Sequence, residues 1–122
     1  MKPYLLKDEE LKELVVKIPG WEINNEQIQR EFKFFNFIEA FSFMTKIALI
    51  CEKYNHHPDW ENVYSKVIIR LSTHDLGGIT NLDQTLASEI NNFDSGILIL
   101  TLLHPSCSLT INENADPNVQ RD

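Results

Sequence analysis

The chain has 122 residues, a length that fits one domain of normal size. Hydrophobic residues make up 43% and charged residues 24% of it, which excludes a disordered chain, a collagen-like repeat and a coiled coil. The net charge of −7, from 11 basic and 18 acidic residues, argues against direct binding of nucleic acid, because proteins that bind DNA or RNA normally present a basic face.

The first predicted element is a helix over residues 7–18. Its apolar residues recur at the spacing of one helix face, and they are Leu11, Leu14, Val15 and Ile18. Acidic residues occupy its first turn, where the helix dipole favours negative charge, and Pro19-Gly20 ends it.

Two short strands are predicted next. Trp21 to Ile23 is the first candidate and residues 24–26 are a plausible turn. Ile28, Phe32 and Phe34 then alternate with polar residues, which is the period of a half-buried strand. The two segments together predict an antiparallel hairpin.

The longest predicted helix runs from Phe37 to about Tyr54. Asn36 is a good N-cap residue, and Glu39 follows three residues later, as in a capping box. The apolar residues form two lines, of which one is Phe37, Phe41, Met44 and Ala48 and the other is Phe43, Ile47, Ile50 and Tyr54. We expect one line, whichever it is, to face the sheet and the other a neighbouring subunit, which predicts a homodimer or homotetramer.

Residues 60–73 have the β-branched and apolar composition of strands, and two arrangements are open. One straight strand would place its ends roughly 45 Å apart at about 3.3 Å per residue. A hairpin turning between Ser65 and Lys66 would pair Val63 with Ile68 and Trp60 with Leu71. It would also bring His57 beside His74 on one side of one pocket.

The last predicted helix begins at Thr80, with Asp83 at the capping-box position, and ends at Ser95-Gly96. We therefore expect a domain over residues 1–96 and a C-terminal extension of unknown role over residues 97–122.

Three further features concern the compartment. No apolar run reaches the roughly 18 residues of a membrane span, and the N-terminus lacks the apolar region of a secretory signal. The two cysteines, Cys51 and Cys107, are too few for a disulfide framework. We expect a cytoplasmic protein with no membrane association, and the sequence leaves open whether it is also nuclear.

Three of the four histidines flank the 60–73 region. His56 and His57 precede Pro58, and His74 precedes a double glycine. Histidine exchanges protons near neutral pH, so these residues suit general acid–base catalysis. Alternatively, the His-His-Pro turn simply ends the long helix. Three histidines and a carboxylate can also ligate zinc, but adjacent histidines seldom aim at one ion, and we expect no metal.

A long motif then becomes recognisable. The run Glu-Lys-Tyr-Asn-His-His-Pro-Asp-Trp-Glu-Asn-Val-Tyr at 52–64, followed by Ser72-Thr73-His74-Asp75, Gly78 and Asp83, resembles the signature of the pterin-4a-carbinolamine dehydratases. The resemblance covers roughly residues 7–94 and includes Gly20-Trp21 and residues 40–44. Members of that family often carry an acidic residue where this chain has Asn55.

The resemblance implies an α+β fold, a four-stranded antiparallel sheet with three helices packed on one face. It implies removal of water from a 4a-hydroxy-tetrahydropterin, the reaction of tetrahydrobiopterin recycling, with no cofactor. His56 and His74 would exchange protons with the pterin, His57 would bind or orient it, and Glu52 would hold a histidine in place. The expected substrate-binding residues are Asn55, Ser72, Thr73, Trp21 and Asp83.

Each of these residues also has a purely structural interpretation. Trp21 and Trp60 suit core or hairpin packing, and Asp83 suits a helix cap. The alternative function, which the family also implies, is a dimerisation cofactor or protein-binding module for a transcription-factor partner.

Overall fold

The computed structural model describes the backbone of residues 1–103 and the side chains of residues 1–94. The predicted extension at 97–122 therefore lies mostly outside the described residues. The chain divides into two units, residues 1–91 and 92–122, and the fold described below is that of the first. Within the described part, no helix is both long enough and apolar enough to span a membrane.

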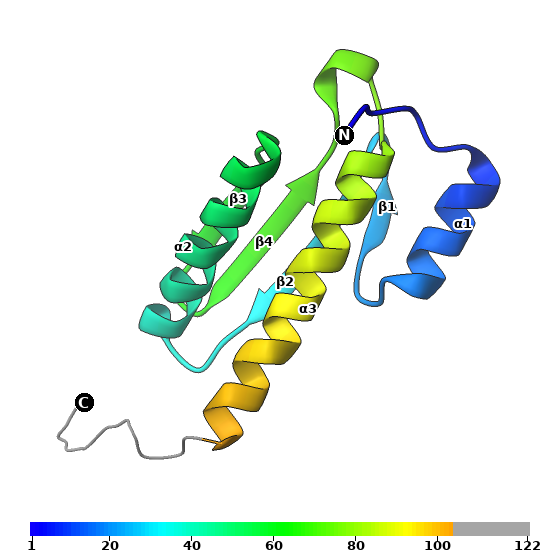
Figure 1. Ribbon diagram of the computed structural model, residues 1–122. Helices are drawn as coiled ribbons and strands as arrows, with labels where there is room; N and C mark the ends of the chain where they lie inside the picture. Colours follow the sequence, from blue (N-terminus) through cyan, green and yellow to red (C-terminus); the bar gives the residue numbers. More distant parts are fainter. Residues whose placement is uncertain (104–122) are drawn as a thin grey trace, which may run out of the picture. The chain divides into compact units, whose positions relative to one another are not determined.

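The elements follow one another in the order α1 (Asp8–Lys17), β1 (Glu22–Asn24), β2 (Gln27–Lys33), α2 (Phe37–Tyr54), β3 (Asp59–Val63), β4 (Lys66–Leu71), a 3₁₀ turn (His74–Leu76) and α3 (Asn81–Leu103). The four strands form one antiparallel sheet in the spatial order β1-β2-β4-β3. Helix α2 and residues 81–91 of α3 lie across one face of it, and α1 lies beside β1 (Figure 1). The predicted α+β class and four-stranded antiparallel sheet are confirmed.

The core lies between this face of the sheet and the helices. Alternate residues of β4 are buried, as the strand period requires, and these are Val67, Ile69 and Leu71. The helices contribute buried residues that include Leu14, Phe43, Ile47, Leu86 and Ile90. The opposite face of the sheet carries polar and charged side chains, among them Arg70, which pairs with Glu61 at 2.5 Å.

The hairpin at residues 59–71 is present, but its predicted register is wrong by two residues. Val63 pairs with Lys66 and Trp60 with Ile69, so the turn is Tyr64-Ser65. The Asn62 side-chain amide donates to the carbonyl oxygens of Tyr64 and Lys66, at 3.1 and 2.9 Å, and this holds the turn in place. A shift of two residues keeps every side chain on its predicted face.

The predicted end of the last helix at Ser95-Gly96 is wrong, because α3 continues to Leu103. One glycine inside a helix costs only about 1 kcal/mol relative to alanine, and the leucines at 98, 100, 102 and 103 are good helix formers. The start is as predicted, since Thr80 immediately precedes α3 and its amide donates to Asp83 at 2.9 Å.

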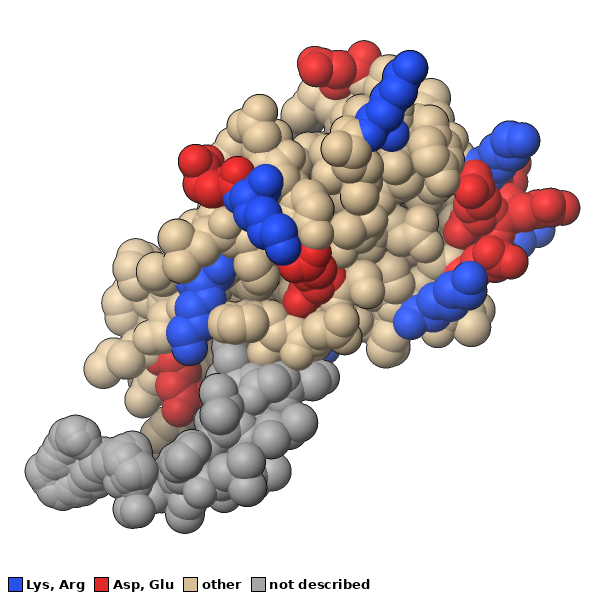
Figure 2. Space-filling view, viewed as in Figure 1, with Lys and Arg blue, Asp and Glu red and all other residues tan. Residues whose placement is uncertain are grey.

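Helix α2 begins as predicted, with the Asn36 side chain accepting from the Glu39 amide at 2.9 Å. Of its two apolar lines, the one with Phe43 and Ile47 is buried in the core. Phe37 and Phe41 of the other line are 47% and 54% exposed, and their rings contact each other with centroids 5.7 Å apart. Figure 2 shows charged side chains gathered over α1 and others spaced more widely over the rest of the face in view.

Candidate active site

The C-terminus of α2 directs the two adjacent histidines. Asn55 adopts the left-handed conformation with φ 51°, and the amide of His56 donates to the carbonyl oxygen of Cys51 at 3.0 Å. This is a Schellman ending, in which asparagine is the commonest residue after glycine. Asn55 therefore has a backbone role here, which turns the chain from α2 into the His-His-Pro segment.

His56 is paired with a buried carboxylate. Its Nε2 lies 2.5 Å from Oδ1 of Asp83, whose side chain is fully buried, while His56 itself is 12% exposed. A carboxylate only accepts hydrogen bonds, so Nε2 carries the hydrogen and donates it. The Nδ1 atom is then the nitrogen of this ring that can accept a proton.

The second oxygen of Asp83 accepts hydrogen bonds from the segment after β4 and from the residue before α3. Its Oδ2 accepts from the Thr73 hydroxyl and from the Thr80 amide, each at 2.9 Å. The hydroxyls of Thr73 and Thr80 lie 2.7 Å apart, and both residues are buried. Both oxygens of the buried Asp83 carboxylate therefore accept hydrogen bonds, as a charge removed from water requires.

Asp83 consequently joins two parts of the predicted site. Thr73 stands between Ser72 and His74 in the chain, and successive Cα atoms are about 3.8 Å apart. The carboxylate that holds His56 is thus bonded to the segment that carries His74. The segments that follow α2 and β4 therefore meet the first turn of α3 at one end of the sheet.

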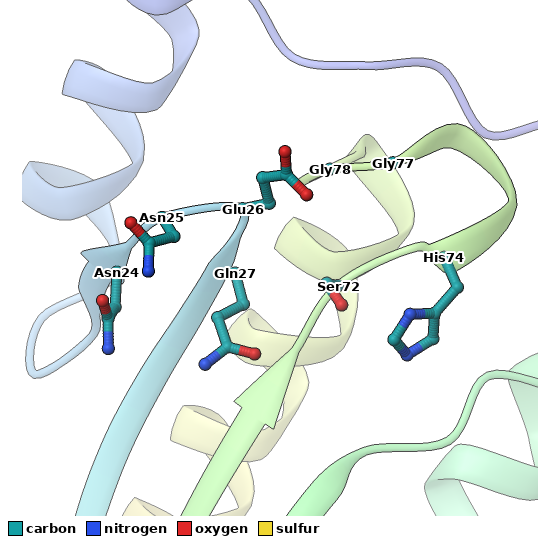
Figure 3. Close-up of a pocket in the computed structure, with 8 residues that line it drawn as sticks. All are labelled: Asn24, Asn25, Glu26, Gln27, Ser72, His74, Gly77 and Gly78. Carbon is teal, nitrogen blue, oxygen red and sulfur yellow. The ribbon is translucent and has the colours of Figure 1, made fainter.

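A pocket of about 390 Å³ opens at this end of the sheet. It is lined by the turn between β1 and β2, by the end of β4 and by the loop before α3, through Asn24, Asn25, Glu26, Gln27, Ser72, His74, Gly77 and Gly78. The sequence pointed to two of these eight, Ser72 and His74. Figure 3 shows Ser72 between the His74 imidazole and the Gln27 amide.

His57 lies on the more exposed side of the site. Its Nε2 is 2.5 Å from Oε2 of Glu52, with the two side chains 56% and 74% exposed. The predicted contact between Glu52 and a histidine is therefore made with His57, not with the buried His56. A pair this exposed orients the ring more than it stabilises the fold.

Trp21 belongs to the core of the domain. It is 3% exposed, packs edge-on against Phe32 and donates from Nε1 to Asn91 at 2.8 Å. Among the residues that line the pocket it does not appear. Thr73 and Asp83 are likewise buried, and their polar atoms bind each other.

Cys51 lies next to Glu52, close to the histidines in the chain, and invites the question of nucleophilic catalysis. Burial, and to a lesser extent the charge of Glu52, raise the pKa of the Cys51 thiol to about 11. The thiol stays protonated at neutral pH and is a poor nucleophile. Within the described part of the chain, no cluster of three or more His, Cys, Asp or Glu side chains is placed to hold a metal ion.

Sequence reasoning missed Thr80 and the turn between β1 and β2 as parts of this site. Thr80 was recognised only as a helix cap, although the same contact that caps α3 also places Asp83. The turn is brought to the site by the strand pairing, because the β2–β4 register places Gln27 one step beyond the Ile28–Leu71 pair and level with Ser72. That register follows from the sheet order, which the sequence pattern does not give.

Comparison with known proteins identifies the family of the chain. The family model described as pterin 4 alpha carbinolamine dehydratase matches residues 4–93. A second model, described as UPF0047 protein YjbQ-like, matches residues 67–122; it overlaps the first and takes in residues outside the described part.

Curated relatives match most of the chain. A protein of Prochlorococcus marinus strain MIT 9312, named "Putative pterin-4-alpha-carbinolamine dehydratase", is 88% identical over 91 residues, which are 75% of this chain and 95% of that protein. Its namesake in strain NATL2A is 54% identical over 87 residues, which are 71% of this chain and 92% of that protein.

A solved structure gives a similar result. The crystal structure titled transcriptional coactivator/pterin dehydratase from Brucella melitensis is 40% identical, with a TM-score of 0.71 over 73% of this chain and 97% of that one. The family model covers the sheet, His56, His57, His74 and Asp83, and the chain belongs to the pterin-4-alpha-carbinolamine dehydratase family.

Proposed function

We propose that this protein removes water from a 4a-hydroxy-tetrahydropterin, with histidines as acid and base. The observation that carries the proposal is the Asp83 carboxylate, which holds His56 and is bonded to Thr73, the residue between the pocket-lining Ser72 and His74. A volume of about 390 Å³ lies within the range of small-molecule sites. The names of the relatives describe the same chemistry.

The reaction needs one acid and one base. The acid protonates the hydroxyl on C4a, the C–O bond breaks and water leaves. The base takes the proton from N5, and the electron pair of that N–H bond forms the C4a–N5 double bond. Two histidines at neutral pH supply both steps, and such proton transfers contribute about 10²- to 10⁴-fold to a rate.

The contacts support particular roles. His56, which holds its Nε2 hydrogen on Asp83, is suited to accept the N5 proton at Nδ1. His74 lines the pocket and is suited to protonate the hydroxyl. Glu52 orients His57 for binding the pterin, whereas Asp83 and Thr73 act as positioning residues, because both are buried against each other.

We infer that His57 lies near the same site, although it is not among the residues that line the pocket. Asp59 pairs with Arg70, and continuing this antiparallel register by two residues beyond β3 would bring His57 level with Ser72. This supports the prediction that His57 and His74 serve one pocket.

The first test is a kinetic assay with a 4a-hydroxy-tetrahydropterin generated in place by an aromatic amino-acid hydroxylase. We expect the purified chain to accelerate loss of water well beyond the spontaneous rate, because acid and base are both positioned. The absorbance change on dehydration measures this. A rate equal to the protein-free control would contradict the proposal and favour the alternative, a binding module for a transcription-factor partner.

We also propose that the protein is a homo-oligomer, dimer or tetramer, through the exposed side of α2. Phe35, Phe37, Ile38 and Phe41 are between 47% and 84% exposed on and before the first turns of this helix. Clustered apolar surface of this kind usually marks an interface.

Light scattering after size exclusion measures the mass in solution. We expect at least twice the 14.2 kDa of one chain at micromolar concentration, and a shift towards the single-chain mass in Phe41→Glu. Val16→Glu is the matched control, because Val16 is 79% exposed on α1. A wild-type mass of one chain contradicts the proposal. An unchanged mass in Phe41→Glu excludes this face of α2 and indicates an interface at a sheet edge instead.

A further inference from the structure

One wall of the pocket has no role in the dehydration chemistry. Gln27, at the start of β2, lies opposite Asn24 in the β1–β2 pairing, and both line the pocket. Among the described residues, the Gln27 side chain has no hydrogen-bonding partner, although it is half-buried. An amide in that position costs free energy unless water or a ligand satisfies it.

Strand register places this amide beside Ser72, which lies two residues before His74 in the chain. The β2–β4 pairing, continued by one residue beyond Ile28–Leu71, sets Gln27 level with Ser72. Both residues then point to the face of the sheet opposite the helices, and neighbouring strands are about 4.8 Å apart. Figure 3 shows the Gln27 amide and the His74 imidazole on either side of Ser72.

The pocket also changes in character from one side to the other. Gly78 is buried and Ser72 and Gln27 are half-buried, whereas His74, Gly77 and the turn residues Asn24, Asn25 and Glu26 are exposed. A flat bicyclic ring gains most from the buried side, where its faces leave water. A flexible substituent with hydroxyl groups suits the exposed, amide-lined side, because its hydroxyls can bind protein and water at once.

The covalent structure of the substrate agrees with this division. Carbon C6 of the pterin is bonded directly to N5, the atom that loses a proton. A substituent on C6 therefore starts next to the reacting atoms and extends away from them over a few bonds. With N5 among the histidines, such a substituent spans the one-strand step from Ser72 to Gln27.

We propose that Gln27 is a specificity-determining residue, whose amide binds a hydroxylated substituent at C6 of the pterin. This inference rests on the proposed function and adds the part of the substrate that the chain distinguishes. Pterins that carry a hydroxylated chain at C6 are then preferred to those with a methyl group, and the Gln27 amide supplies the difference.

The test compares two substrates in Gln27→Leu, which keeps the size of the side chain and removes its hydrogen bonds. We expect kcat/KM for the 4a-hydroxy-tetrahydropterin with a dihydroxypropyl chain to fall about fivefold to tenfold, chiefly through KM. For the 6-methyl substrate we expect a change of less than about twofold. Gln27→Asn, one methylene shorter, should recover part of the difference.

Glu31→Leu is the control, because Glu31 lies on the same strand and face but outside the pocket. Its selectivity should match that of the unaltered chain. An equal loss with both substrates in Gln27→Leu would overturn the inference, since it would mean contact with the ring, and an unchanged selectivity would overturn it too.

Binding measurements separate this inference from the proposed function. The stable 7,8-dihydropterins with the same two substituents are titrated into the unaltered chain and Gln27→Leu by calorimetry. If the chain turns the substrate over but its affinity for the dihydropterins does not depend on Gln27, the proposed dehydratase function stands and the inference is refuted. Absence of turnover refutes the proposed dehydratase function. Selective binding that is lost in Gln27→Leu then still supports Gln27 as the residue that distinguishes the C6 substituents.

Discussion

Replacing His56 or His74 by alanine is expected to lower kcat about 100-fold or more, because in the proposed mechanism each change removes one of the two groups that exchange protons with the pterin. KM should change much less, since the remaining pocket residues still bind the ring. Single-turnover kinetics on pre-formed 4a-hydroxy-tetrahydropterin isolate this step from product release. Glu52→Gln should cost less, because Glu52 contacts only the exposed His57.

The two histidine variants differ in their expected effect on stability. His74 is exposed, so His74→Ala should unfold at nearly the same temperature as the unaltered chain. His56→Ala removes the partner of a buried carboxylate and should be less stable. A kcat within about threefold of the unaltered chain in both folded variants would remove the acid–base assignment.

The second large effect is expected from Asp83→Asn. The amide keeps the shape of the carboxylate, but its nitrogen donates, so it faces either the His56 ring or the donors from Thr73 and Thr80 with the wrong polarity. If it faces the ring, His56 must move its hydrogen to Nδ1 and can no longer accept a proton there. We expect kcat to fall about 100-fold and the free energy of unfolding to fall by about 1–3 kcal/mol.

Denaturant unfolding and the kinetic assay measure these two quantities on one preparation. Asp8→Asn is the matched control, because Asp8 stands exposed in the first turn of α1, where the loss of a charge costs at most about 1 kcal/mol. If Asp83→Asn lowers stability but leaves kcat unchanged, Asp83 is only a helix cap. If it changes neither, the buried network has no role in the reaction.

The elements that the sequence predicts well are those decided by nearby residues. Asn36 and Glu39 mark the start of α2, Pro19-Gly20 follows α1, and the alternation of Ile28 and Phe32 gives β2. In each case a cap, a breaker or a strand period acts within a few residues. The start of α3 at Thr80 belongs to the same group.

The errors arise where distant residues or a side-chain contact decide. The β3–β4 turn is set by the Asn62 amide, which no turn signature contains, and the pattern alone fits both registers. The pattern predicts the end of α3 too early, because Gly96 indicates a helix end although the apolar residues after it continue the helix. The site shows the same division, since the motif points to the histidines, but the pairing of His56 with Asp83 depends on how α3 lies across the sheet.

The Asp83 carboxylate also sets a limit on local motion. Its bonds to the Thr80 amide, the Thr73 hydroxyl and the His56 ring come from three segments of the chain. Fraying of the first turn of α3 would break all three together and release His56 from its orientation. Hydrogen exchange at the Thr80 amide therefore reports how often the proposed catalytic arrangement is lost, and a pterin that requires the arrangement should slow that exchange in proportion to its occupancy.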